Sequence, residues 1–115
     1  MHRSIYLAAP LLVLAACQTT ATQSAAVDPE AHALAQAACA GCHSVERVGL
    51  SPNPDAPEWP VIANTPGLTR ATLTTWLTDA HNYPEEMDFY LEEDEIDQLV
   101  TYLLTLQDAD YHPPY

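Results

Sequence analysis

Two cysteines and a histidine lie close together in the run Cys39-Ala40-Gly41-Cys42-His43. Their C-x-x-C-H spacing matches the attachment motif of c-type haem. At this spacing, two thiols at the end of a helix can each form a thioether with one vinyl group of a haem, and the adjacent imidazole can bind the iron. The motif therefore predicts one haem c per chain, covalently attached through Cys39 and Cys42, with His43 as an iron ligand.

Three other uses of the same residues stay open. Cys39 and Cys42 could form a disulfide in an oxidising compartment. With His43 they could bind zinc, although a zinc site needs a fourth ligand. They could also form a thioredoxin-like redox pair, but such a pair belongs to a βαβ unit and the chain shows no strand pattern. The export signal and the small core described below favour haem attachment.

The N-terminal region has the features of an export signal. Arg3 precedes an apolar run over residues 5–16, which is shorter than the roughly 20 residues of a membrane-spanning helix. The run ends in Leu14-Ala15-Ala16-Cys17, which resembles the bacterial lipobox. Cleavage before Cys17 would leave this cysteine as an acylated N-terminus, and several acyl chains together anchor a protein stably to a membrane.

These features divide the chain into three parts. We expect a signal peptide over residues 1–16, a lipidated cysteine and flexible tether over residues 17–27, and a single domain over residues 28–115. The alternative is an ordinary signal peptide cut near Ala25, which would release a soluble periplasmic protein. Gln18 follows the cysteine and resembles the residues that direct lipoproteins to the outer membrane.

The chain is acidic, with a formal net charge of −13 from 3 Lys and Arg against 16 Asp and Glu. Arg47 and Arg70 are the only cations after the signal region, which leaves the domain without lysine. Such a surface repels phosphate, so we exclude a nucleic-acid function. Eight acidic residues lie between Glu85 and Asp97, and they predict redox partner proteins with a basic docking face.

Three segments have the pattern of helices. Asp28-Pro29-Glu30 is a helix start, and the alanine-rich residues 31–38 continue it into the cysteine motif. Thr69 is placed to cap a short helix over residues 70–79. A last helix over about residues 93–106 carries apolar side chains at helical spacing.

Between the first two of these helices, residues 49–67 contain five prolines and no helical period. We expect a long irregular loop, which in a compact domain is usually functional. Three short helices give a small core, and a large flat apolar cofactor would complete it.

The order of elements resembles the monohaem class I c-type cytochromes across residues 28–107. Both have a first helix, the C-x-x-C-H motif, a proline-rich loop, a short helix, a methionine loop and a last helix. The resemblance implies an all-α class I cytochrome c fold, with three to four short helices around one covalently bound haem. It also implies that the last helix crosses the first, with Ala31 near the crossing and Tyr102 facing it.

The resemblance implies a second iron ligand, Met87, in the loop before the last helix. Its thioether is a soft ligand that favours ferrous iron and raises the reduction potential. The family's proline after this methionine is replaced here by Asp88, and His81 is the alternative ligand.

Further cofactor-binding residues follow from the same resemblance. The carbonyl of Pro57 is expected to accept a hydrogen bond from the second ring nitrogen of the axial histidine. Trp59 and Trp76 are expected to wall the haem, with ordinary core packing as the alternative. Arg47 or Arg70 could pair with a haem propionate, or lie on the solvated surface.

We expect an extracytoplasmic electron carrier on the periplasmic side of a bacterial membrane, anchored through Cys17, rather than an enzyme, although a place as a subunit of a redox enzyme complex stays open. The alternative is a haem enzyme or small-ligand sensor with a labile sixth iron site.

Overall fold

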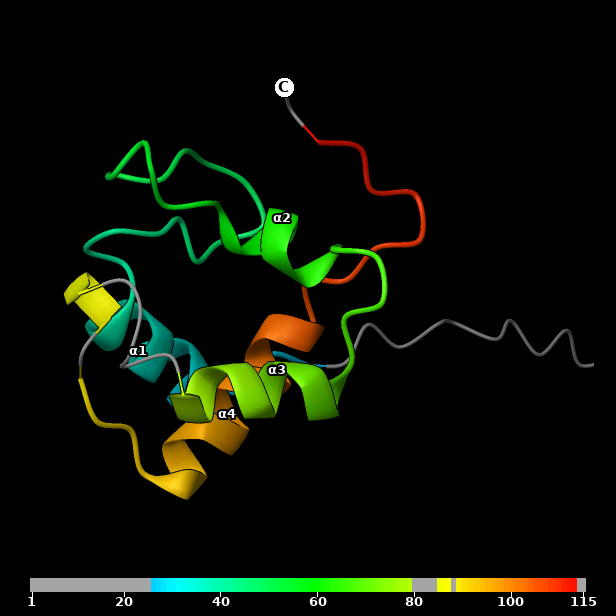
Figure 1. Cartoon of the computed structure of the whole chain (residues 1–115). Coiled ribbons are helices and arrows are strands. Elements are labelled where there is room, and N and C mark those ends of the chain that lie inside the picture. Colours follow the sequence, from blue (N-terminus) through cyan, green and yellow to red (C-terminus); the bar gives the residue numbers. More distant parts are fainter. Residues whose placement is uncertain (1–25, 80–84, 88, 114–115) are drawn as a thin grey trace, which may run out of the picture.

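The computed structural model describes residues 26–79, 85–87 and 89–113, and these residues form helices and connecting segments without a strand. The elements follow in the order α1 (Pro29–Ala38), α2 (Trp59–Ala63), α3 (Arg70–Asp79), the 3₁₀ turn η2 (Glu85–Met87) and α4 (Glu93–Leu104). The central element is α4, which packs against α1, α2 and α3 (Figure 1). The predicted all-α fold is confirmed.

Several predictions fall outside the described residues. They concern the signal peptide, Cys17, most of the tether, His81 and Asp88. In the part of the chain that is described, none of the helices combines the length and apolarity needed to cross a bilayer.

The start of α1 follows the predicted capping pattern. The Asp28 carboxylate accepts a hydrogen bond of 2.9 Å from the backbone N–H of Glu30. Pro29 occupies the first turn, where its missing N–H would have no helical partner in any case. Ala31 and Ala35 are only 1% and 0% exposed, and their small side chains allow α1 to approach α4 closely.

At its own start, α4 has a capping box. The Glu92 side chain accepts from the backbone of Glu95, and the N–H of Glu92 donates to Glu95 Oε2 at 2.9 Å. Acidic side chains also occupy the first turn, where the helix dipole favours negative charge. The helix ends at Leu104, slightly earlier than predicted.

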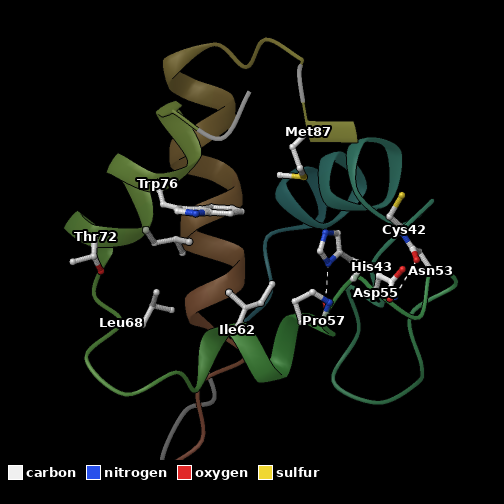
Figure 2. Close-up of a pocket in the computed structure, with 12 residues that line it drawn as sticks. Cys42, His43, Asn53, Asp55, Pro57, Ile62, Leu68, Thr72, Trp76 and Met87 are labelled. Carbon is white, nitrogen blue, oxygen red and sulfur yellow. Dashed lines mark hydrogen bonds between the residues drawn. The ribbon is translucent and has the colours of Figure 1, made fainter. Parts of the chain in front are cut away.

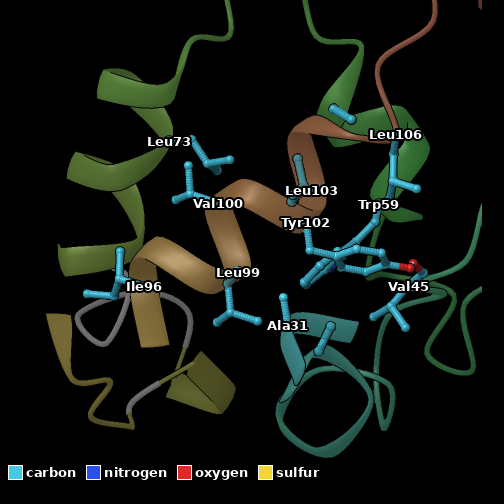
Figure 3. Close-up of a cluster of buried hydrophobic side chains, with 12 residues drawn as sticks. Ala31, Val45, Trp59, Leu73, Ile96, Leu99, Val100, Tyr102, Leu103 and Leu106 are labelled. Atoms are coloured by element: carbon cyan, nitrogen blue, oxygen red, sulfur yellow. The ribbon is translucent and has the colours of Figure 1, made fainter. Parts of the chain in front are cut away.

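The core lies along α4 and beside α1. Its buried apolar residues are Ala31, Ala35, Val45, Trp59, Ala63, Leu73, Ile96, Leu99, Val100, Tyr102, Leu103 and Leu106 (Figure 3). Tyr102 packs its ring against Trp59, with 5.7 Å between the ring centroids, and against the edge of His32. The positions predicted for Ala31 and Tyr102 near the helix crossing are therefore confirmed.

The predicted boundaries of α3 are also confirmed. Thr69 and Thr72 cap its start reciprocally: each backbone N–H donates to the other residue's hydroxyl, at 2.9 and 3.2 Å. At the same end, Arg70 pairs with Asp97 at 2.8 Å and donates to Thr101 at 2.9 Å. The two contacts of Arg70 therefore connect α3 to α4.

The prediction of an irregular chain over residues 49–67 is wrong in part, because α2 lies within it. Pro60 stands in the first turn of this five-residue helix, where proline is tolerated and its fixed φ favours the helical conformation. Gly49 and Gly67 bound the region with φ of 125° and 81°, values that favour glycine. The helix was missed because five residues are too few to show a helical period and because prolines are frequent in this region.

Candidate functional site

The cysteine motif forms a tight turn at the end of α1. Cys39 is the C-cap of the helix, and its carbonyl accepts hydrogen bonds from the N–H groups of Cys42 and His43 at 3.1 and 2.9 Å. The turn brings the motif to the wall of a large cavity that Cys42 and His43 both line. A smaller inner cavity of about 90 Å³ lies beside it and is lined by all three residues.

The large cavity has a volume of about 710 Å³ and mostly apolar walls. This volume falls within the range of about 300–1,000 Å³ that is usual for sites of organic ligands. Figure 2 shows Trp76 and His43 on opposite sides of the cavity, with Ile62 and Pro57 closing it at the end near α2. The hollow is therefore large and apolar enough for a flat organic cofactor.

The ring of His43 is fixed by a hydrogen bond. Its Nδ1 lies 2.7 Å from the carbonyl oxygen of Pro57 (Figure 2). Because a carbonyl only accepts, Nδ1 carries the proton and Nε2 keeps a lone pair that can bind a metal. The contact is the one that the resemblance implied for Pro57.

The backbone after His43 is held from three sides. The carbonyl of Ser44 accepts a hydrogen bond from the N–H of Trp59 at 2.9 Å. The N–H of Ser44 donates to the Ser51 hydroxyl at 3.0 Å. The carbonyl of Val45 accepts from the Tyr102 hydroxyl at 2.8 Å. The imidazole therefore starts from a backbone that is tied to both α2 and α4.

The other predicted site residues take different places. Trp76 is 50% exposed and lines the large cavity, as does Met87. Figure 2 shows Met87 directed toward the space between Trp76 and His43. Trp59 is only 4% exposed and packs in the core, where it lines the inner cavity instead.

Both motif cysteines are free thiols. Burial raises the pKa of the Cys39 thiol to about 11, and the neighbouring Cys42 is a smaller cause. A thiol that stays protonated is a poor partner in disulfide exchange, which weakens the case for a redox pair. Across the described ranges, no three His, Cys, Asp or Glu side chains gather in a way that could hold a metal ion, so no zinc cluster is found there.

Neither arginine lines the cavity. Arg47 donates to the carbonyl of Thr105, and Arg70 pairs with Asp97. Both guanidinium groups thus contact α4 or its C-cap, which gives the proposed propionate pairing no support. Besides Cys42 and His43, the polar side chains of the lining are those of Asn53, Asp55 and Thr72.

Sequence reasoning missed part of this lining. Ile62 belongs to the unpredicted helix α2, and Leu68 directly precedes the Thr69 cap. A hydrophobic residue just before an N-cap commonly packs inward, so Leu68 had a readable signal. Asn53 had a turn signal in Asn-Pro-Asp, and its side chain accepts from the N–H of Asp55 at 3.0 Å.

Comparison with known proteins gives one family match. A family model described as Cytochrome c matches residues 30–107, which include all four helices except the first residue of α1. No curated protein and no solved structure matches the chain.

Proposed function

The chain belongs to the cytochrome c family, and from this premise we propose that it is an extracytoplasmic electron carrier with one haem c and His43 and Met87 as axial ligands. Haem binding and electron transfer follow from the family. The ligand pair, the anchor and the partner are the finer parts of the proposal.

The observation that carries the proposal is the hydrogen bond from His43 Nδ1 to Pro57, at 2.7 Å, on the wall of the 710 Å³ cavity. It selects the tautomer whose Nε2 is a ligand, and it makes that nitrogen more basic. Two free thiols at the same turn supply the covalent attachment. The residues present therefore fit a haem.

Each residue has a distinct part in holding the group. The S–H bonds of Cys39 and Cys42 would add across the two vinyl groups of the haem, so that no atom would be lost and no oxidant would be needed. His43 provides a nitrogen ligand, and Met87 provides a thioether. When bound, the haem supplies a one-electron ferric–ferrous couple.

The walls of the cavity suit a carrier. Apolar walls give a bound haem surroundings of low polarity, and a methionine ligand favours the ferrous form, so both would raise the reduction potential. Met87 as a ligand would also keep oxygen and peroxide from the iron. Ligation by Met87 therefore distinguishes an electron carrier from the alternative, a haem enzyme or sensor.

We place the protein at the periplasmic face of a bacterial membrane, with Cys17 as its acylated anchor and the outer membrane favoured by Gln18. Its partners are redox proteins with basic docking faces, since the chain carries a net charge of −13. Opposite charges steer such encounters, and salt screens them over about 8–10 Å. Electron-transfer rates to a basic partner should therefore fall as ionic strength rises, and a flat or rising rate would contradict this part.

The haem proposal is tested by intact mass and haem staining of denatured protein. The mature chain should carry the mass of one haem, and the double variant Cys39→Ala, Cys42→Ala should carry none. A wild-type chain that folds without added mass would refute the proposal. Cys17→Ala should move the protein from the membrane fraction to the soluble periplasm or block its processing.

The ligand proposal is tested by carbon monoxide binding and redox titration. Met87→Ala should lower the potential and open the ferrous site to carbon monoxide, whereas His81→Ala should change neither. Rapid binding of carbon monoxide to the unmutated protein at neutral pH would favour the enzyme or sensor instead.

A further inference from the structure

A groove separate from the large cavity lies between α3, α4 and the segment that leads into α4. Its volume is about 490 Å³, and it shares no lining residue with the large cavity. Leu77 and Ile96 contribute apolar surface, and Ile96 is only 6% exposed. In Figure 1 this region lies where the gold segment after η2 turns into α4, beside the end of α3.

Aromatic and acidic side chains complete the lining. Phe89 and Tyr90 come from the connecting segment, and Tyr90 is 79% exposed. Glu93 and Asp97 stand one turn apart on α4, so both carboxylates lie on the same side of the helix. The lining of the groove thus combines apolar side chains, aromatic rings and negative charge.

This combination matches one kind of side chain. Arginine and lysine have an aliphatic stem that packs on apolar surface and a cationic end that binds carboxylates or ring faces. The chain itself provides an example, since Arg70 reaches Asp97 at 2.8 Å. Glu93 has no ion-pair partner among the described residues, so its charge is available to an incoming cation.

The position of the groove connects it to the proposed iron ligand. The N–H of Phe89 donates to the carbonyl of Met87 at 2.9 Å, so the groove and the methionine share one short backbone segment. A partner held in the groove would therefore lie next to the segment that carries Met87.

We propose that this groove receives an arginine or lysine side chain from the basic face of the redox partner, with the stem on Leu77 and Ile96 and the cation between Glu93 and Tyr90. The inference rests on the proposed function and specifies where docking occurs. Charge selects a basic protein over other occupants, because anionic lipid headgroups and a second copy of a chain with net charge −13 are both repelled.

The test uses acetyl-tetraarginine amide as the probe and the haem-loaded mature chain in its ferrous state, labelled for NMR. Addition of the peptide should shift the amide signals of Thr74, Thr78, Tyr90 and Ile96 more than those of other residues. Glu93→Gln should weaken binding about 2- to 5-fold, the range expected for one exposed charge pair. Tyr90→Ala should weaken it further, whereas Tyr90→Phe should preserve it because the ring remains.

Asp94→Asn is the matched control. Asp94 stands in the same first turn and is exposed like Glu93, but it does not line the groove. If Glu93→Gln and Asp94→Asn weaken binding equally, or if the shifts spread evenly over the acidic surface, binding is unspecific attraction and the inference is overturned. Haem content is measured separately by mass, so loss of the proposed function and loss of the groove are distinguished.

Two other occupants of the groove, a second copy of the chain and a membrane, are tested by separate measurements. Sedimentation that detects a dimer broken by Glu93→Gln would assign the groove to a second copy. Binding of the Cys17→Ala protein to phosphatidylglycerol vesicles, lost in Tyr90→Ala, would assign it to a membrane. Either result would overturn the inference.

Discussion

Replacing Tyr102 with phenylalanine removes one buried hydroxyl and leaves the aromatic ring in place. The hydroxyl donates to the carbonyl of Val45 at 2.8 Å, and both residues are buried, at 3% and 2% exposure. Burial raises the pKa of Tyr102, and the charge of Glu46 raises it further, so the group stays protonated and donates throughout the neutral range. In the described part of the chain, no other donor reaches this carbonyl.

The expected loss follows from that missing donor. A buried acceptor left without a partner costs about 1–3 kcal/mol. In a domain of this size each kcal/mol lowers Tm by about 4–8 °C. The hydroxyl also ties α4 to the backbone two residues after His43, so the variant should alter the haem spectrum as well as the stability.

The assay is denaturant unfolding of the haem-loaded protein followed by circular dichroism, with a spectrum of the folded variant. Tyr90→Phe is the control, because its hydroxyl is exposed and lies 3.5 Å from Glu92. We expect that control to stay within about 0.5 kcal/mol of the wild type. Equal unfolding midpoints for the two variants would refute the reasoning.

Three further variants test other contacts by the same unfolding measurement. Leu99→Ala, at a core position with 1% exposure, should cost about 2–5 kcal/mol, and a loss well below about 1 kcal/mol would contradict its central place beside α1. The pKa of Glu46 lies below its ordinary value of 4.5, chiefly because of the hydrogen bond with His32, so the contribution of the Glu46 carboxylate to stability is present above that pH and is lost as the pH falls below it. Glu46→Gln should therefore flatten the fall in stability as the pH drops below 4.5, and an unchanged slope would rule this out. Arg70→Gln breaks an exposed ion pair with Asp97 and should lower the free energy of unfolding by less than about 1 kcal/mol. This difference from the wild type should vanish in about 1 M salt. A loss of stability that persists in salt would point to the hydrogen bond with Thr101 instead.

Local chemistry made much of the fold predictable. Asp28 and Thr69 both precede helices, and in the structure both caps form as the sequence indicates. The helix over Glu93–Leu104 was predicted from its apolar spacing. Such signals act within one turn, so the sequence displays them directly.

The features that were not predicted depend on contacts between segments that are far apart in the sequence. A five-residue helix such as α2 is too short for a hydrophobic period, and its Pro60 is one of the five prolines from which an irregular loop was predicted, although it stands in the first turn. The lining residues Ile62 and Leu68 reach the cavity only through the path of that region. The contact between His43 and Pro57 was expected from the family resemblance, since nothing local relates residues 14 positions apart.

His43 and Met87, which were predicted to bind iron, both line the large cavity. The groove beside Glu93 had no sequence signal beyond the acidic run, because its apolar base comes from two helices.

The crossing of α1 and α4 has a consequence for how the chain is made. The first helix of the domain finds its main packing partner in the last one, so Ala31 and Ala35 stay uncovered until the C-terminal part has been synthesised. Contacts between opposite ends of a chain require a long loop to close and form slowly. During this interval the thiol of Cys39 has not yet acquired the burial that raises its pKa to about 11. Truncation before residue 93 should therefore leave Cys39 as reactive toward an alkylating reagent as an ordinary free thiol, whereas the folded chain should react more slowly.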